Sequence, residues 1–279
     1  MKGIIVVDKP SNISSNKVVS IVKKLTGEKA GHMGTLDPLA SGVLPVCIGK
    51  ATRLFDYFLK KRKTYLAEFT FGYMTDTLDC EGKVVAEGGR IPDRDEIIKV
   101  CSNMLGEINQ VPPMYSAKSV NGVRAYELAR KGVRIDLKPK LINIYKFLLT
   151  EYNGARCAFE IECSSGTYIR SICRDLAVTM GTYATMTALR RVRSGPFSIE
   201  KSVSLDCLNI DTIIKNLINI DSVIDLDTIE LDDVDYIRFL HGLKIATDEI
   251  GNYKIKHNDE VVAIAEAKDG IIHIKTNLN

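Results

Sequence analysis

The sequence lacks the long apolar runs of membrane proteins. Its 279 residues contain no stretch approaching the ~20 consecutive apolar residues that a membrane-spanning helix needs. The apolar run at residues 3–7 is too short for a secretory signal, and Asp8, Lys9 and Pro10 follow it directly. We therefore expect a cytoplasmic protein that needs no membrane.

Paired cysteines and clustered histidines are also missing. The seven cysteines include no C-x-x-C pair, and the four histidines are too far apart for two ligands on one helix. A P-loop reading of residues 42–51 fails on its glycine spacing, and a calcium-loop reading that starts at Asp225 lacks its third ligand and its glycine. The pattern predicts reduced thiols and no metal site.

Charge is distributed unevenly along the chain. Residues 1–200 carry 30 Lys+Arg and 20 Asp+Glu, a balance of +10, whereas residues 201–279 carry 8 and 15, a balance of −7, and the two add to the formal +3. A basic body suits a polyanionic partner, because each neutralised phosphate releases counterions. Charge alone favours an ordinary solvated surface over a polyanion-binding one.

Hydrophobic periodicity predicts strands and helices that alternate irregularly. Strands are expected at 3–7, 65–71 and 156–163, and helices at 15–24, 54–59, 94–104, 124–131 and 167–178. Without a short repeat, this order predicts an α+β fold with a large mixed or antiparallel sheet flanked by helices.

The character of the chain changes past residue 205. Acidic residues accumulate at 221–235, and short strand patterns follow at 253–255, 261–264 and 271–274. We therefore predict a large domain over residues 1–205, and a linker with a small β module over residues 206–279.

The most informative segment is a glycine-rich loop at residues 31–42, with the sequence GHMGTLDPLASG. Gly31 and Gly34 allow the backbone to approach another molecule closely. Pro38 favours an extended conformation at Asp37 and so restricts where its carboxylate points. A loop that presents a carboxylate and an imidazole suits an active site, although an aspartate before proline is more often a turn former.

This loop resembles the catalytic motif of the tRNA pseudouridine-55 synthases, the TruB family. Other blocks that resemble the family follow in its order across residues 3–197: 3–10, 43–53, 63–65, 112–117, 122–127, 166–170 and 189–195. Residues 43–45 and 49–53 continue the loop motif, and the other six blocks are separate from it. Any one block is weak, but six in register cover the whole larger domain. The C-terminal module matches only loosely, as a short PUA-like RNA-binding module.

The resemblance implies a pseudouridine synthase fold and the isomerisation of uridine 55 in the T loop of tRNA. It implies that Asp37 is the catalytic carboxylate, a nucleophile or an aid to cleavage of the base–sugar bond, with Arg170 as its partner. It also implies that Tyr65 packs on the target base and that Tyr168 lies beside the base and helps to remove the C5 proton. The T-stem loop of tRNA is then the expected partner.

RNA-contacting residues follow from the same resemblance and from the basic surface. His32 is expected to contact the RNA near the flipped nucleotide, and Leu189 to form an apolar wall. Phosphate contacts are expected from Lys60, Lys61, Arg62, Lys63, Arg124, Arg190, Arg191 and Arg193.

The reaction itself asks for these residue types. It is redox-neutral, so no cofactor or metal is expected. A carboxylate can act as a nucleophile or stabilise positive charge at the sugar. Extruding the uridine costs a few kcal/mol, and stacking on an aromatic ring returns about 1–3 kcal/mol.

Two alternatives stay open. A guide-RNA-dependent relative would share the catalytic blocks, and a non-enzymatic tRNA folding helper would need only the basic cleft. Two positions depart from the family pattern: Lys118 stands one position early, and Asn12 replaces a common glycine but tolerates positive φ. We expect a monomer with no obligate protein partner.

Overall fold

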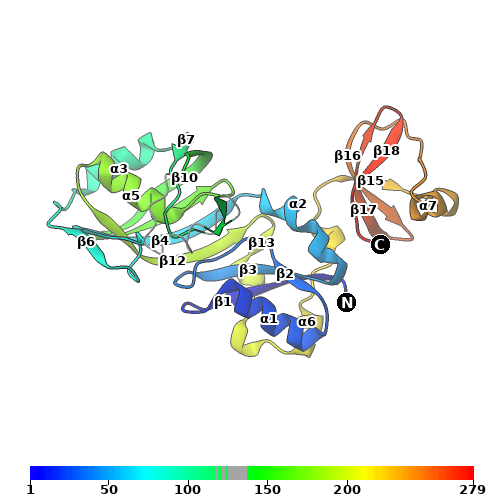
Figure 1. Cartoon of the computed structure of the whole chain (residues 1–279), viewed down its shortest axis with the longest axis horizontal. Helices are drawn as coiled ribbons and strands as arrows, with labels where there is room; N and C mark the ends of the chain where they lie inside the picture. The colour runs from blue at the N-terminus through cyan, green and yellow to red at the C-terminus, as the bar shows by residue number, and fades with distance from the viewer. Residues whose placement is uncertain (117–118, 121–122, 125–136) are drawn as a thin grey trace.

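The computed structural model describes residues 1–116, 119–120, 123–124 and 137–279. A large sheet with helices forms the main body, and a small sheet with one helix stands at one end of it (Figure 1). Of the helix expected at 124–131, residue 124 lies in a strand and residues 125–131 lie outside the described residues. No described helix combines the length and the apolar character that a membrane span requires.

The main body is built on a ten-stranded mixed sheet. Its order is β14-β1-β3-β12-β4-β11-β10-β7, with β2 paired to β3 and β13 paired to β12. Most neighbours are antiparallel, but β1–β14 and β12–β3 are parallel. The strands are β1 (Gly3–Lys9), β2 (Ala30–His32), β3 (Ser41–Ile48), β4 (Lys63–Phe71), β7 (Gly106–Gln110), β10 (Lys140–Asn153), β11 (Arg156–Cys163), β12 (Ala184–Ser194), β13 (Phe197–Ser198) and β14 (Val203–Ser204). The expected α+β fold with a large mixed sheet is confirmed.

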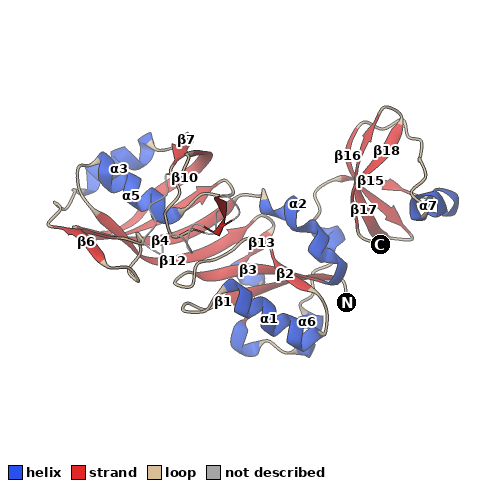
Figure 2. Ribbon diagram, viewed as in Figure 1, coloured by secondary structure: helices blue, strands red, loops and turns tan. Residues whose placement is uncertain are grey.

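Helices cover the sheet and connect its strands (Figure 2). They are α1 (Ser15–Thr26), α2 (Phe55–Leu59), α3 (Arg94–Asn103), α5 (Ile169–Thr179), α6 (Ile210–Lys215) and α7 (Asp233–Leu240), with short 3-10 turns η1 (Gly49–Leu54), η2 (Ile199–Lys201), η3 (Leu205–Cys207) and η4 (Ile220–Val223). Two small hairpins were not expected from the sequence: β5 (Tyr73–Thr75) with β6 (Val84–Glu87), and β8 (Ser119–Val120) with β9 (Val123–Arg124).

Helix α1 shows why these elements form where they do. The Ser14 side chain accepts a hydrogen bond from the Lys17 N–H at the N-cap, and Gly27 ends the helix with φ +68°. Val18 and Val22 lie on its buried face, as the periodicity predicts.

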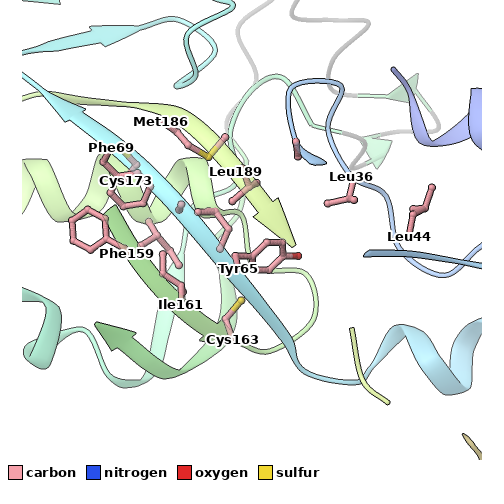
Figure 3. Packing of buried hydrophobic residues seen from close by; sticks show 14 of the residues in the cluster. Leu36, Leu44, Tyr65, Phe69, Phe159, Ile161, Cys163, Cys173, Met186 and Leu189 are labelled. Atoms are coloured by element: carbon pink, nitrogen blue, oxygen red, sulfur yellow. The ribbon is translucent and has the colours of Figure 1, made fainter. Parts of the chain in front are cut away.

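Strand β4 carries the centre of the core. Its odd-numbered residues are buried and its even-numbered ones are more exposed, because successive side chains point to opposite faces. Phe69 stacks against Phe159 of β11 with ring centroids 4.7 Å apart. Figure 3 shows Tyr65 and Leu189 at the end of this packed row, on the side where Leu36 lies. Leu36, the neighbour of Asp37, belongs to the same cluster as Tyr65 and Leu189, so the core reaches the segment that carries Asp37.

Strand β1 is buried on both faces. Ile5 and Val7 pack in the cluster that contains α1 and α5, whereas Ile4 packs in a second cluster with Val261 and Leu278 of the C-terminal sheet. That sheet has the order β15-β16-β17-β18. It confirms the three strands expected there, as β16 (Gly251–His257), β17 (Glu260–Lys268) and β18 (Ile271–Asn277), and adds β15 (Asp227–Glu230), which was not expected. The division at residue 205 stays a prediction.

Candidate active site

The loop that carries Asp37 is fixed by buried side chains on both sides. The Ser15 hydroxyl donates to the Leu36 carbonyl and accepts from the Leu36 N–H, both at 2.9 Å. Lys9, fully buried, donates to the carbonyls of Pro10, Ile13 and Pro38 at 2.9, 2.7 and 3.2 Å. The loop therefore presents its carboxylate from a rigid frame.

Asn12 completes this frame. It has φ 65°, as its tolerance of positive φ allows, and its N–H donates to the Pro38 carbonyl at 2.8 Å. The turn therefore survives the replacement of the glycine that is common at this position.

Arg191 and Gly42 hold the far side of the loop. The Arg191 guanidinium donates through Nε to the Val43 carbonyl at 2.8 Å and through Nη2 to the Gly34 carbonyl at 3.1 Å. Gly42 has φ +101°, and a Cβ there would lie 2.2 Å from the Arg191 carbonyl oxygen. Only glycine allows β3 and β12 to approach this closely.

Arg170 joins two carboxylates at the start of α5. Its Nη2 lies 2.8 Å from Asp37 Oδ2, and its Nη1 lies 3.4 Å from Asp79 Oδ2. It also donates to the carbonyls of Thr77 and Tyr115, each at 3.0 Å. The Arg170 and Asp79 side chains are 7% and 8% exposed, but that of Asp37 is 37% exposed. Asp37 is thus the accessible member of a buried network.

A pocket of about 220 Å³ opens beside Asp37. Tyr65 and Leu189 line its inner end, and Tyr168 and Arg170 line one side. Burial raises the pKa of Tyr65 and of Tyr168, and the negative charge of Asp37 adds to the shift at both, so both phenols are neutral at neutral pH. The pocket is lined by one carboxylate, the guanidinium groups of Arg170 and Arg191, the amine of Lys63 and two neutral aromatic hydroxyls.

Two basic residues expected on the outer surface are buried, which corrects that expectation. Arg191 is 1% exposed and Lys63 5% exposed. Lys63 donates to the carbonyls of Leu59 and Lys61, both at 2.7 Å. Burial and the charge of Arg191 lower the pKa of Lys63 to about 8. Both side chains line the pocket, where their N–H groups donate hydrogen bonds to backbone carbonyls.

The other expected RNA-contacting residues do not line this pocket. Arg193 is exposed, and Arg190 is half-buried with Nη2 2.7 Å from Asp8 Oδ2. His32 is partly buried at the end of β2, and its Nδ1 has no hydrogen-bond partner among the described residues. Burial and the charge of Arg191 lower the pKa of His32. Arg124 is placed in β9, and its side chain is not described.

Sequence reasoning missed Asp79 and Lys9 as parts of the site. Nothing near Asp79 in the sequence marks it, because its partner lies 91 positions later on α5. Lys9 is next to Pro10 in a block that resembles the family, so the sequence could have marked it as a candidate. Nothing in the sequence indicated that its side chain is buried. Within the described residues, no cluster of His, Cys, Asp and Glu could hold a metal ion.

A second hollow, of about 360 Å³, lies across the sheet from Tyr65. It is lined by even-numbered β4 residues such as Leu66 and Glu68, which face away from the core. Its charged groups are neutralised within the protein, since Glu68 pairs with Arg156 and Arg190 with Asp8. The smaller pocket beside Asp37 is therefore the candidate active site.

The chain matches known proteins over most of its length. Residues 20–169 match the model of the TruB family pseudouridylate synthase N-terminal domain, and residues 170–223 match that of the tRNA pseudouridylate synthase B C-terminal domain. The chain is 42% identical over 258 residues to tRNA pseudouridine synthase B of Clostridium kluyveri, covering 92% of this chain and 89% of that protein. It is 40% identical over 272 residues to the Clostridium tetani protein of the same name, covering 96% and 93%.

Solved structures give the same fold. A Cbf5-Nop10-Gar1 complex contains a chain with a TM-score of 0.72 and 27% identity, covering 99% of this chain and 85% of that one. An H/ACA RNP bound to a substrate RNA containing 2'-deoxyuridine contains another, with a TM-score of 0.70 and 26% identity over the same shares. Fold and sequence together define a pseudouridylate synthase. The chain belongs to the TruB family.

Proposed function

We propose that this chain is a tRNA pseudouridine synthase that isomerises uridine 55 in the T loop, with Asp37 as its essential carboxylate. The observation that carries the proposal is the contact of Asp37 with Arg170, 2.8 Å long, at the opening of a pocket that ends on Tyr65. An accessible carboxylate held by a buried guanidinium suits reaction at a sugar carbon.

The reaction breaks the N1–C1′ bond of the uridine and forms a C5–C1′ bond, while C5 loses a proton and N1 gains one. Asp37 acts at the sugar, as a nucleophile or by stabilising positive charge. The ring of Tyr65 packs on the base, and the apolar side chain of Leu189 closes the wall that retains the detached uracil. Tyr168 lies beside the base, where its neutral hydroxyl relays the C5 proton rather than serving as a standing phenolate.

RNA binding is assigned to basic side chains around the opening. Lys60, Arg62 and Arg193 are exposed, and His32 lies at the edge of the site with a free ring nitrogen among the described residues. Because Arg190 pairs with Asp8 and Arg62 lies 3.6 Å from Glu162, their positive charges are partly offset. Lys60 and Arg193 are the strongest candidates for phosphate contacts.

Two rival functions are disfavoured by particular observations. A guide-RNA-dependent enzyme fits the solved neighbours at 26–27% identity, but the proteins named tRNA pseudouridine synthase B reach 40–42% over most of the chain. A folding helper without chemistry would not need a buried arginine such as Arg170 to hold two carboxylates. Chaperoning can coexist with catalysis.

The test uses unmodified tRNA transcript labelled with tritium at C5 of uridine. We expect the protein to release one tritium per tRNA at catalytic turnover, and none from a transcript in which uridine 55 is replaced by cytidine. Release that continued from the second transcript would show a different target position. No release from either would refute the activity.

A further inference from the structure

Gln110 is the only glutamine in the chain. It ends β7, beside the start of α5, and is 1% exposed. Its side chain makes two hydrogen bonds, both to the backbone of Tyr168: Oε1 accepts from the Tyr168 N–H at 2.8 Å, and Nε2 donates to the Tyr168 carbonyl at 3.1 Å. The partners fix which atom is oxygen, since a backbone N–H only donates and a carbonyl only accepts.

This two-point contact fixes the backbone where the helix begins. Tyr168 is the N-cap of α5, with φ −104° and ψ 113°, and no side chain of its own caps the helix. Its carbonyl also accepts the first helical bond, from Ile172 N at 3.1 Å. Gln110 therefore holds Tyr168 in an extended conformation in the way that a neighbouring strand would.

The segment after Gln110, residues 111–115, makes hydrogen bonds to side chains of α5. The Val111 carbonyl accepts from Ser171 Oγ and from Arg174 Nη2, each at 2.9 Å, and the Tyr115 carbonyl accepts from Arg170. These bonds hold the helix against the segment. Gln110 holds the backbone of Tyr168, the residue that leads into the helix, at both its N–H and its carbonyl.

We propose that Gln110 is a positioning residue for the reaction: it fixes where the Tyr168 phenol, and the Arg170 guanidinium two residues later, meet the flipped nucleotide. The inference rests on the proposed function. Misplacing a group by about 1 Å can cost about 10²-fold in rate, even when the change is outside the chemistry. The basic residues proposed to bind RNA lie on other elements. We therefore expect loss of the Gln110 contact to lower kcat and to leave KM nearly unchanged.

Gln110→Glu provides a pH-dependent test. A protonated glutamic acid can still accept from the Tyr168 N–H and donate to its carbonyl, but a carboxylate places a charged oxygen against that carbonyl. We expect the ratio of the variant's kcat to the parent's, measured by tritium release, to fall about tenfold as pH rises from about 6 to about 8.5, because burial raises the pKa of a carboxylic acid into this range.

Gln110→Met keeps the length of the side chain but removes both bonds, so its kcat ratio should be lowered about 10-fold to 100-fold at every pH, with KM within about twofold of the parent's. Asn109→Asp and Asn109→Met are matched controls, since Asn109 is the exposed neighbour on the same strand. Both should keep the parent's kcat and show no pH-dependent ratio.

The outcomes separate this inference from the function on which it rests. Parent-like kcat in both Gln110 variants, or a loss explained wholly by the unfolded fraction in thermal melts, overturns the positioning role alone. A raised KM with unchanged kcat also overturns it. A parent protein that releases no tritium overturns both the role and the function.

Discussion

Arg170 is the residue whose surroundings say most about the site. An arginine in the first turn of a helix is ordinarily a surface residue, yet this one is buried and makes four charge-assisted contacts. A planar guanidinium can bridge separate acceptors in fixed directions, which a lysine ammonium cannot. Its burial explains why Asp37 points to the pocket instead of to solvent.

Arg170→Lys should therefore abolish most of the activity without unfolding the protein. We expect kcat/KM to fall by about 10²-fold or more, since a lysine cannot hold Asp37 and Asp79 together. Steady-state tritium release measures the effect. The control is Arg156→Lys, which alters an exposed arginine of β11 that pairs with Glu68 of β4. Its rate should stay near the parent's. Parent-like activity in Arg170→Lys would show that the bridge is dispensable.

Residue-level prediction from the sequence was uneven for a physical reason. The resemblance placed Asp37, Tyr65, Tyr168 and Arg170, and the structure gathers all four around one pocket. Charge counting placed Arg191 on the surface, because a sequence does not show which cations satisfy buried carbonyls. Asp79 left no signal at all, since only the fold brings it to Arg170.

At the level of elements, the close approach of β3 and β12 supports the Asp37 loop. These strands are parallel neighbours in which Arg191 pairs with Gly42. Alternation predicted β4 and β11, whose periodicity is strong, and the caps predicted α1. The short β2, β13 and β14 were missed, because strands of two or three residues have no periodicity to read and depend on their neighbours. The longer β3, β7, β10 and β12 were not expected either.

Gly42→Ala tests this support. The added Cβ meets the Arg191 carbonyl, and φ +101° strains any residue with a side chain, so we expect the free energy of unfolding to fall by about 2 kcal/mol or more. Urea melts measure the loss. Gly31→Ala, where a Cβ meets nothing within 4 Å, should change stability by about 0.5 kcal/mol at most. Equal stability of the two variants would contradict the proposed packing.

The whole molecule combines a basic body with an acidic C-terminal segment and a core rich in thiols. Cys47, Cys101, Cys157, Cys163 and Cys173 are buried, whereas Cys80 and Cys207 are exposed. Burial raises the pKa of Cys47 and Cys101 to about 12 and that of Cys157 and Cys163 to about 11, and it raises the pKa of Cys173 well above its ordinary value. The expectation of free cysteines holds for all seven.

These thiols predict a loss of stability in alkali. Above pH 9 the unfolded chain ionises its thiols while the folded protein keeps five of them protonated, so unfolding is favoured as pH rises towards 11. Lys9 and Lys63 oppose this fall in stability, because their pKa in the folded protein is about 8. Up to about pH 10.5, the unfolded chain therefore binds two more protons at these lysines than the folded protein does. The net difference of three protons gives a fall of at most about 4 kcal/mol per pH unit.

Urea melts at pH 8.5, 9.5 and 10.5 under reducing conditions measure this dependence. We expect the free energy of unfolding to fall between the last two. A curve that stays flat or rises would show that the thiols are accessible in the folded protein.

The central claim is that the Asp37 carboxylate performs the chemistry, and the most direct measurement compares tritium release by the parent and by Asp37→Asn. Asparagine keeps the shape of the side chain but removes its charge. We predict catalytic turnover by the parent, almost none by Asp37→Asn, and tRNA affinity within about threefold for both, because phosphate contacts dominate binding. Asp248→Asn, an exposed aspartate in the C-terminal segment, should match the parent. Equal turnover by Asp37→Asn and the parent would contradict the account.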